Sequence, residues 1–176
     1  MELTLSGLIA NMVVMVFVIA MLGLLFNLTL NVLNQQQEYA AFYAEVQSIT
    51  DILDNILTQS VWNDELIDEQ GKPRATEIDP NGKFVYLKFF SPVGMNVVTI
   101  KKKLEFVSVG DSVIIRFDSK DLVKTSKIKD ISVSLETKDE TSGEIKDPKF
   151  LIITFTHNNG KINYSVPLLT ALSSSS

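Results

Sequence analysis

Few side chains in this 176-residue chain are of the types that do chemistry. It has no cysteine and one histidine, His157, which excludes a thiol nucleophile, a disulfide framework and an iron–sulfur centre. The histidine stands beside the turn signal Asn158-Asn159-Gly160, so we expect an exposed residue at the end of a strand rather than a catalytic base. Neither a glycine-rich phosphate loop nor a nucleophile elbow is present. We therefore expect no catalytic residue, no cofactor and no metal centre.

Three charged clusters remain as candidate binding sites. Asp118–Asp121 and Asp139-Glu140 lack the spacing of a calcium-binding loop, and we interpret both as solvated loops. Lys101-Lys102-Lys103 resembles an anion-binding patch. Successive residues of a strand face opposite sides, however, so at least one of these lysines must bury its stem or lie at a sheet edge. We interpret the triplet as a solvated or edge-protecting cluster. The net charge of -5 argues against a nucleic-acid partner.

Two stretches match the acceptor pattern for N-glycosylation. Asn163-Tyr164-Ser165 lies in a predicted β region, so Asn163 is a candidate acceptor. Asn27-Leu28-Thr29 lies inside a long apolar run, where we expect it to be inaccessible.

The charged residues are unevenly distributed along the chain. All 16 lysines and arginines lie from Lys72 onward, and residues 3–37 carry no charge. Within this segment, Leu8–Leu33 is interrupted only by Asn11, Asn27, Thr29 and Asn31 among polar residues. As a helix these 26 residues are roughly 39 Å long, enough to cross a hydrocarbon core of about 30 Å. A cleaved secretory signal fits less well, because no basic residue precedes the run and the run is too long.

The helical pattern continues beyond the apolar run. There is no proline before Pro73 and no glycine between Gly23 and Gly71, so nothing local ends the helix early. From Tyr39 the apolar residues recur at helical spacing and form one face. We predict one helix of about 60 residues from about Leu5 to about Leu66. We expect the second half of this helix to pack against the rest of the chain through Tyr39, Phe42, Val46, Ile49, Leu53 and Ile56.

The first half of this helix is apolar all round, which predicts that something surrounds it. Asn27, Asn31 and Asn34 share one face, and two interpretations are open: a polar seam between neighbouring helices, or the water-exposed end of a membrane span. The residues expected in a filament core or in helix packing are Leu8, Val13, Val16, Phe17, Ala20, Leu24, Phe26, Asn27, Asn31 and Asn34.

The rest of the chain has the period of two that is typical of strands. Six candidate strands are rich in β-branched and aromatic residues, and Asn158-Asn159-Gly160 predicts a tight hairpin between the last two. We therefore predict an α+β protein in which the long helix is followed by an antiparallel, immunoglobulin-like β-sandwich. Its expected parts are an apolar helix (1–34), an amphipathic continuation (35–67), a polar linker (68–82) and a β head (83–176). The candidate strands are Lys83–Phe90, Asn96–Ser108, Ser112–Asp118, Ile131–Thr137, Lys149–His157 and Lys161–Val166.

This order of a long N-terminal helix and a small β domain resembles type IV pilins. Bacterial members carry a glutamate within the apolar segment, four residues after the mature N-terminus, and Leu3–Ile9 contains none. Leu5-Ser6-Gly7 is similar to the start of archaeal pilins, whose helix lacks this glutamate and whose head is immunoglobulin-like. Prepilins also carry a short basic leader, and no lysine or arginine precedes the run here. A removed leader, cleavage within Met1–Leu5 and an unprocessed chain are the alternatives.

The resemblance implies a structural subunit of an extracellular pilus filament that serves adhesion or cell contact. Copies of the chain would be its partners, with the membrane as the surroundings before assembly, and surface glycans or envelope proteins as candidate targets. The alternative keeps the helix in the membrane. The chain would then be a bitopic accessory protein, similar to the stator-like proteins of the archaeal swimming filament, whose β domain binds envelope or archaellum components.

Overall fold

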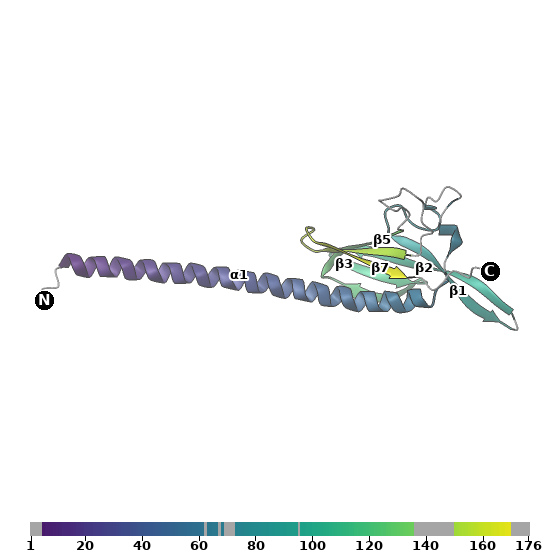
Figure 1. Cartoon of the computed structure of the whole chain (residues 1–176), viewed down its shortest axis with the longest axis horizontal. Helices are drawn as coiled ribbons and strands as arrows, with labels where there is room; N and C mark the ends of the chain where they lie inside the picture. Colours follow the sequence, from purple (N-terminus) through teal and green to yellow (C-terminus); the bar gives the residue numbers. More distant parts are fainter. Residues whose placement is uncertain are drawn as a thin grey trace. The chain divides into compact units, whose positions relative to one another are not determined.

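A computed structural model describes residues 5–61, 63–66, 68, 73–94, 96–135 and 150–169. The chain divides into two compact units, Met1–Ala41 and Phe42–Ser176, and each is described by itself. The described part of the first unit, from Leu5 to Ala41, is helix. The second contains the end of the same helix and all the strands (Figure 1).

The helix α1 runs from Leu5 to Thr58, which is 54 residues or about 81 Å. The prediction of one long N-terminal helix is confirmed, but its end near Leu66 was wrong. After Thr58, Ser60 Oγ donates to the carbonyl of Leu57 in the last turn of the helix at 2.7 Å. The next residue leaves the helical pattern, and the Val61 amide donates to the carbonyl of Lys88 at 2.7 Å. A 3-10 turn, η1, follows at Asp64–Leu66. Pairing with a strand therefore ends the helix, which no local residue signals.

The strands form two antiparallel sheets, so the α+β class is confirmed. In each sheet every hydrogen-bonded neighbour is the next strand along the chain, in the orders β1-β2-β3-β4 and β5-β6-β7. An immunoglobulin domain instead exchanges strands between its sheets, so this part of the prediction is not confirmed among the described strands. Their bounds are β1 Phe84–Val93, β2 Asn96–Val109, β3 Ser112–Phe117, β4 Lys120–Thr125, β5 Ile128–Leu135, β6 Phe150–His157 and β7 Asn163–Leu169.

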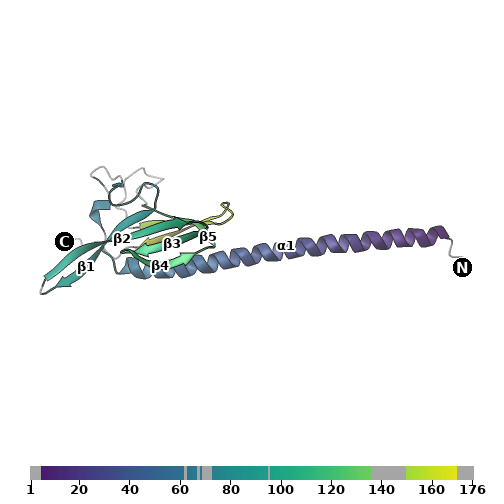
Figure 2. The ribbon, with the colours of Figure 1, turned by 180° about the vertical axis from the view of Figure 1, so that it is seen from behind.

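One strand was missed in the sequence. β4 lies in a stretch for which we predicted no strand, and it pairs with β3 beyond a turn at Asp118 and Ser119 (Figure 2). Both residues have positive φ, 52° and 67°, which suits a two-residue hairpin although neither is glycine. The connection between the predicted strands Ile131–Thr137 and Lys149–His157 lies outside the described residues.

The last hairpin is wider than predicted. The His157 amide donates to the carbonyl of Ile162 at 2.9 Å, so four residues rather than two separate the paired positions. Of the turn residues Asn158-Asn159-Gly160, only Gly160 has positive φ, at 68°. The Asn159 side chain instead accepts the amide of Lys161 at 2.9 Å and closes the loop from within.

One hydrophobic core holds the second unit together. It takes alternate residues from both sheets and the apolar face of the last turns of α1. Part of the predicted linker also belongs to it, since Ile78 is buried and pairs with Val85. The largest fully buried side chains are Phe42, Phe155, Ile49, Leu53, Leu57, Leu66, Leu87, Leu104, Ile115, Ile128, Ile131 and Leu151.

Gly82 marks a close approach between the segment before β1 and the second sheet. Its carbonyl accepts the amide of Val133 at 2.8 Å, and its φ of 72° is in the left-handed region. A Cβ added here would lie 2.7 Å from the backbone oxygen of Val133, which cannot move without disturbing β5.

We expect Gly82→Ala to lower the free energy of unfolding of the second unit by about 2 kcal/mol or more, from the left-handed conformation and the backbone clash together. Gly94→Ala is the matched control, because Gly94 also has positive φ but nothing lies within 4 Å of an added Cβ. It should cost about 1 kcal/mol. Urea denaturation in a mild detergent, monitored by tryptophan fluorescence, measures the free energy of unfolding of both variants. Equal losses would show that the approach at Val133 imposes no constraint.

Candidate functional site

The first unit presents an apolar surface on every side of α1. All twenty large apolar side chains between Leu5 and Leu33 are 41–76% exposed in the single chain. Burying each of these side chains is worth about 1.5–3 kcal/mol. This surface therefore needs lipid or protein around it, and a neighbour on one side would leave the other side in water.

The described chain has one helix, α1, that is long and apolar enough to cross a membrane. The uncharged helical segment, residues 5–37, is about 50 Å long, compared with a hydrocarbon core of about 30 Å.

The predicted packing residues of the first half all lie exposed on this segment. Val16 and Phe17 are among the most exposed, at 67% and 69%. Asn27, Asn31 and Asn34 are also exposed and share a helical face, which both of their interpretations require. Thr29 Oγ1 donates to the carbonyl of Leu25 at 2.8 Å and so satisfies its own hydroxyl within the helix.

The predicted packing residues of the second half have a different environment. Phe42, Val46, Ile49 and Leu53 are at most 2% exposed and lie in the core of the second unit, and Ile56 packs against them. The sixth, Tyr39, is half-buried and belongs to the first unit. The apolar stripe read from the sequence is therefore the face by which α1 joins the β strands.

Two aromatic contacts join this part of α1 to the end of the second sheet. The rings of Phe42 and His157 meet edge to face with centroids 4.9 Å apart, and Tyr43 and Tyr164 do so at 5.6 Å. The expectation that His157 is solvent-exposed was wrong, since it is 6% exposed. A signal was present in β6, because Leu151–His157 alternates and the histidine falls on the buried side.

Each lysine of the triplet in β2 is engaged. Lys101 Nζ lies 2.5 Å from a carboxylate oxygen of Glu65 and 2.8 Å from one of Glu77. Lys102 lies over the rings of Phe89 and Phe117. Lys103 lies over Phe84, with Nζ 4.6 Å from the ring centroid, and contacts Glu105 at 2.8 Å. Lys101 thus holds neighbouring segments to the first sheet, and the other two lysines pack within that sheet, so the triplet is not a free cationic patch.

Glu65 is the centre of the ion-pair cluster that ties η1 to the first sheet. Hydrogen bonds from Lys101 and from Lys88 lower the pKa of this carboxyl, and the bond to Glu65 raises the pKa of Lys101. The groups are exposed, so water screens much of the attraction. The cluster therefore positions this connection and adds little stability.

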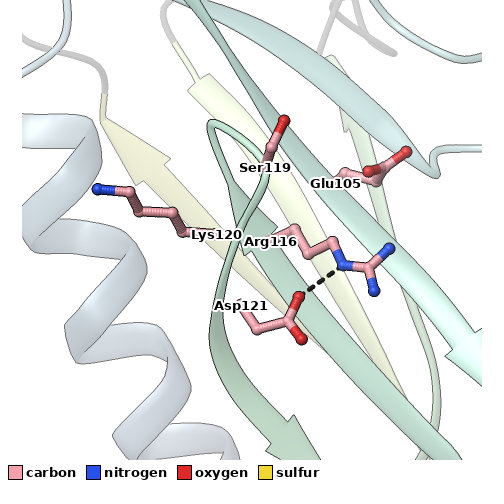
Figure 3. A pocket seen from close by; sticks show the side chains of 5 residues that line it. All are labelled: Glu105, Arg116, Ser119, Lys120 and Asp121. Atoms are coloured by element: carbon pink, nitrogen blue, oxygen red, sulfur yellow. Dashed lines mark hydrogen bonds and ion pairs between the residues drawn. The ribbon is translucent and has the colours of Figure 1, made fainter.

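The hairpin β3–β4 carries a shallow hollow lined by Glu105, Arg116, Ser119, Lys120 and Asp121 (Figure 3). Arg116 Nε lies 2.6 Å from Asp121 Oδ1, and this bond raises the pKa of the guanidinium. Lys120 points away from the pair. Neither a base nor a nucleophile is poised here, and the arrangement is that of a surface ion pair.

No group of three metal-ligating side chains comes together among the residues that the structure describes. The expected solvated loop at Asp118–Asp121 is the hairpin just described, and Asp139-Glu140 lies outside the described residues. Asn163 opens β7 and is exposed, so the candidate acceptor is accessible. Its glycosylation stays a prediction.

Comparisons with protein-family models, with curated proteins and with solved structures find no match to this chain. The residues described above therefore carry the functional inference.

The two halves of α1 should respond differently to the same substitution. Leu53 is fully buried and Leu24 is 65% exposed. We expect Leu53→Ala to destabilise the second unit by about 2–5 kcal/mol because it leaves a cavity. Leu24→Ala should stay within about 0.5 kcal/mol. The measurement is urea denaturation in detergent. A loss for Leu24→Ala as large as that for Leu53→Ala would contradict the division.

The ion-pair cluster predicts a pH effect. Because the folded pKa of Glu65 is lowered, its pairing stabilises the fold above the ordinary glutamate pKa of about 4.3 and is lost as pH falls through the lowered pKa. Lys101→Gln should move the pKa of Glu65 upward in a carboxyl NMR titration, since it removes the strongest partner. The control is Lys129→Gln, at an exposed lysine on β5. A Glu65 pKa that both variants leave unchanged would refute the assignment.

Proposed function

We propose that this chain is a structural subunit of an extracellular, type IV pilus-like filament. Copies assemble by bundling the uncharged part of α1, and the β units form the outer surface. The chain does no catalysis of its own in this role. Before assembly the same helical segment resides in the membrane.

The observation that carries the proposal is the exposure of twenty large apolar side chains around the whole circumference of the helix from Leu5 to Leu33. Lipid covers such a helix before assembly. Outside lipid, several helices of the same kind must cover it together, because one neighbour covers one side. A contact of this type between identical chains is heterologous and does not close, and its product is a helical filament.

The second half of α1 supports the proposal from the other side. Its buried face, from Phe42 to Leu57, makes the helix part of the core of the β unit. A subunit that is carried into a bundle by its helix thus carries a folded β unit with it. The Leu5-Ser6-Gly7 start and the order of elements add the resemblance to archaeal pilins.

A charge in the uncharged segment tests the proposal. An aspartate at the centre of an apolar helix costs about 2.5–3.5 kcal/mol even in a membrane, and in a bundle every copy would carry it. We expect Val16→Asp to abolish filaments in electron micrographs of the cells. Ser48→Asp is the control, because Ser48 is exposed on the helical part of the second unit, and its filaments should be normal.

Two outcomes would count against the filament. Normal filaments from Val16→Asp cells would refute bundling of this segment. If the native chain is never filamentous and dissolves in detergent as single copies, the membrane-anchored alternative replaces it. Proteolysis of the Val16→Asp chain checks that its β unit is folded.

A further inference from the structure

The first sheet has an extension that is only two strands wide. The β1–β2 ladder continues to Val93 and Asn96, whereas pairing of β2 with β3 begins at Leu104. We call Phe89–Val93 with Asn96–Ile100 the arm. Both views show β1 and β2 running on beyond β3 and β4 (Figures 1 and 2).

The arm is uncharged and apolar on both faces. No charged residue occurs from Phe89 to Ile100. Val98 and Ile100 lie on the face that continues the core side of the sheet, and Phe90 and Val97 lie on the opposite face. Five of its large apolar side chains are 37–67% exposed: Phe90, Val93, Val97, Val98 and Ile100.

The two edges of the arm differ in their backbone. On β1 the backbone N–H and C=O groups of the even-numbered residues point away from β2. The Lys88 carbonyl accepts the Val61 amide, and the Tyr86 amide donates to the Glu77 carbonyl. Pro92 is therefore an outward residue, and it has no N–H to offer. On β2 the backbone N–H and C=O groups of the odd-numbered residues point away from β1, because the carbonyl of Lys103 accepts the amide of Asp118 at 2.9 Å.

On β2 of the arm and just beyond it, the residues whose backbone groups point away from β1 are thus Val97, Thr99 and Lys101. Among the described strands, β1 alone pairs with β2 at these positions. Other outer strands carry residues that discourage pairing: Lys120 and Lys124 on β4, and Pro167 on β7. The Asn96–Ile100 stretch has neither a charge nor a proline.

We propose that the arms of two copies of this chain pair through this β2 edge, antiparallel and centred on Thr99. In that register Thr99 faces Thr99 of the other copy, and Val97 faces Lys101. Each of these residues turns its N–H and C=O groups away from β1, and no other described strand pairs with them, so the two copies can present these groups to each other.

Some registers of this strand against a second copy would place lysine opposite lysine, and the proposed register avoids this repulsion. Lysines meet apolar or polar residues rather than lysines, and like charges directly opposite would destabilise the pair. Val98 comes opposite Ile100 of the other copy, which joins the exposed apolar faces of the two arms. A central Thr–Thr pair is also among the favourable cross-strand pairs.

The contact is isologous, with a two-fold axis through the Thr99 pair. Successive subunits of a polar helical filament are not related by such an axis. The pairing would therefore link two filaments side by side, or two anchored copies, and it does not depend on which form the chain takes.

The absence of native cysteine makes the register testable in the full-length chain. Thr99→Cys should form a disulfide-linked dimer under mild oxidation in native membranes or detergent, because paired Cα atoms at an antiparallel site lie about 5.5 Å apart. Val97→Cys is the matched control. In the proposed register its two copies lie four residues out of line, about 13 Å apart, too far for a disulfide.

The double variant Val97→Cys/Lys101→Cys completes the test, since these positions face each other between copies. We expect at least tenfold more dimer from Thr99→Cys and from the double variant than from Val97→Cys alone. Adding Thr99→Lys to the double variant places two lysines opposite each other and should remove most of its dimer.

Equal dimer from Thr99→Cys and Val97→Cys would mean random collision and would overturn the proposal. Monomer from both Thr99→Cys and the double variant would also overturn it, and would point to lipid or another protein as the cover of the arm. Loss of filaments in Val16→Asp cells bears on the proposed function and leaves this result unaffected.

Discussion

The constraint on which the rest depends is the hydration of one helix surface. Twenty large apolar side chains surround α1 from Leu5 to Leu33, with no charge among them, and water cannot solvate them without a large loss of free energy. On the proposed function, this surface must be covered both before assembly and after it. Lipid and a bundle of like helices are two solvents of similar polarity, so a chain of this kind can pass from one to the other without exposing the helix to water.

In the second unit the same helix has a different role, which is to contribute one face to the hydrophobic core. Beyond Ala41 the apolar residues narrow to one face, and this face enters the core that both sheets share. One element thus has two environments, set by how far its apolar residues extend around its circumference. The charged residues follow the same logic. Glu65, Lys88 and Lys101 hold the connection after the helix against the first sheet, and the lysine triplet is used within the unit.

Much of this arrangement was predictable because it is written in local periodicity. The buried residues Phe42, Val46, Ile49 and Leu53 recur at helical spacing. All six predicted strands overlap observed strands, and β4 is the observed strand that was missed. β4 escaped prediction because Lys120, Asp121 and Lys124 obscure its alternation. His157 was misjudged because its neighbours Asn158 and Gly160 signal a turn, although its place in the alternation of β6 indicates burial.

The sequence by itself determined the long uncharged helix, its amphipathic continuation and the change to strands, because charge and a period of 3.6 or 2 depend on near neighbours alone. The tertiary structure decided where the helix ends, since Val61, three residues beyond Thr58, pairs with Lys88. It also decided that His157 packs on Phe42, that the lysines are paired, and that β2 extends beyond β3, where its edge has no partner among the described strands. Each of these depends on residues distant in sequence, whose approach only the folded chain establishes.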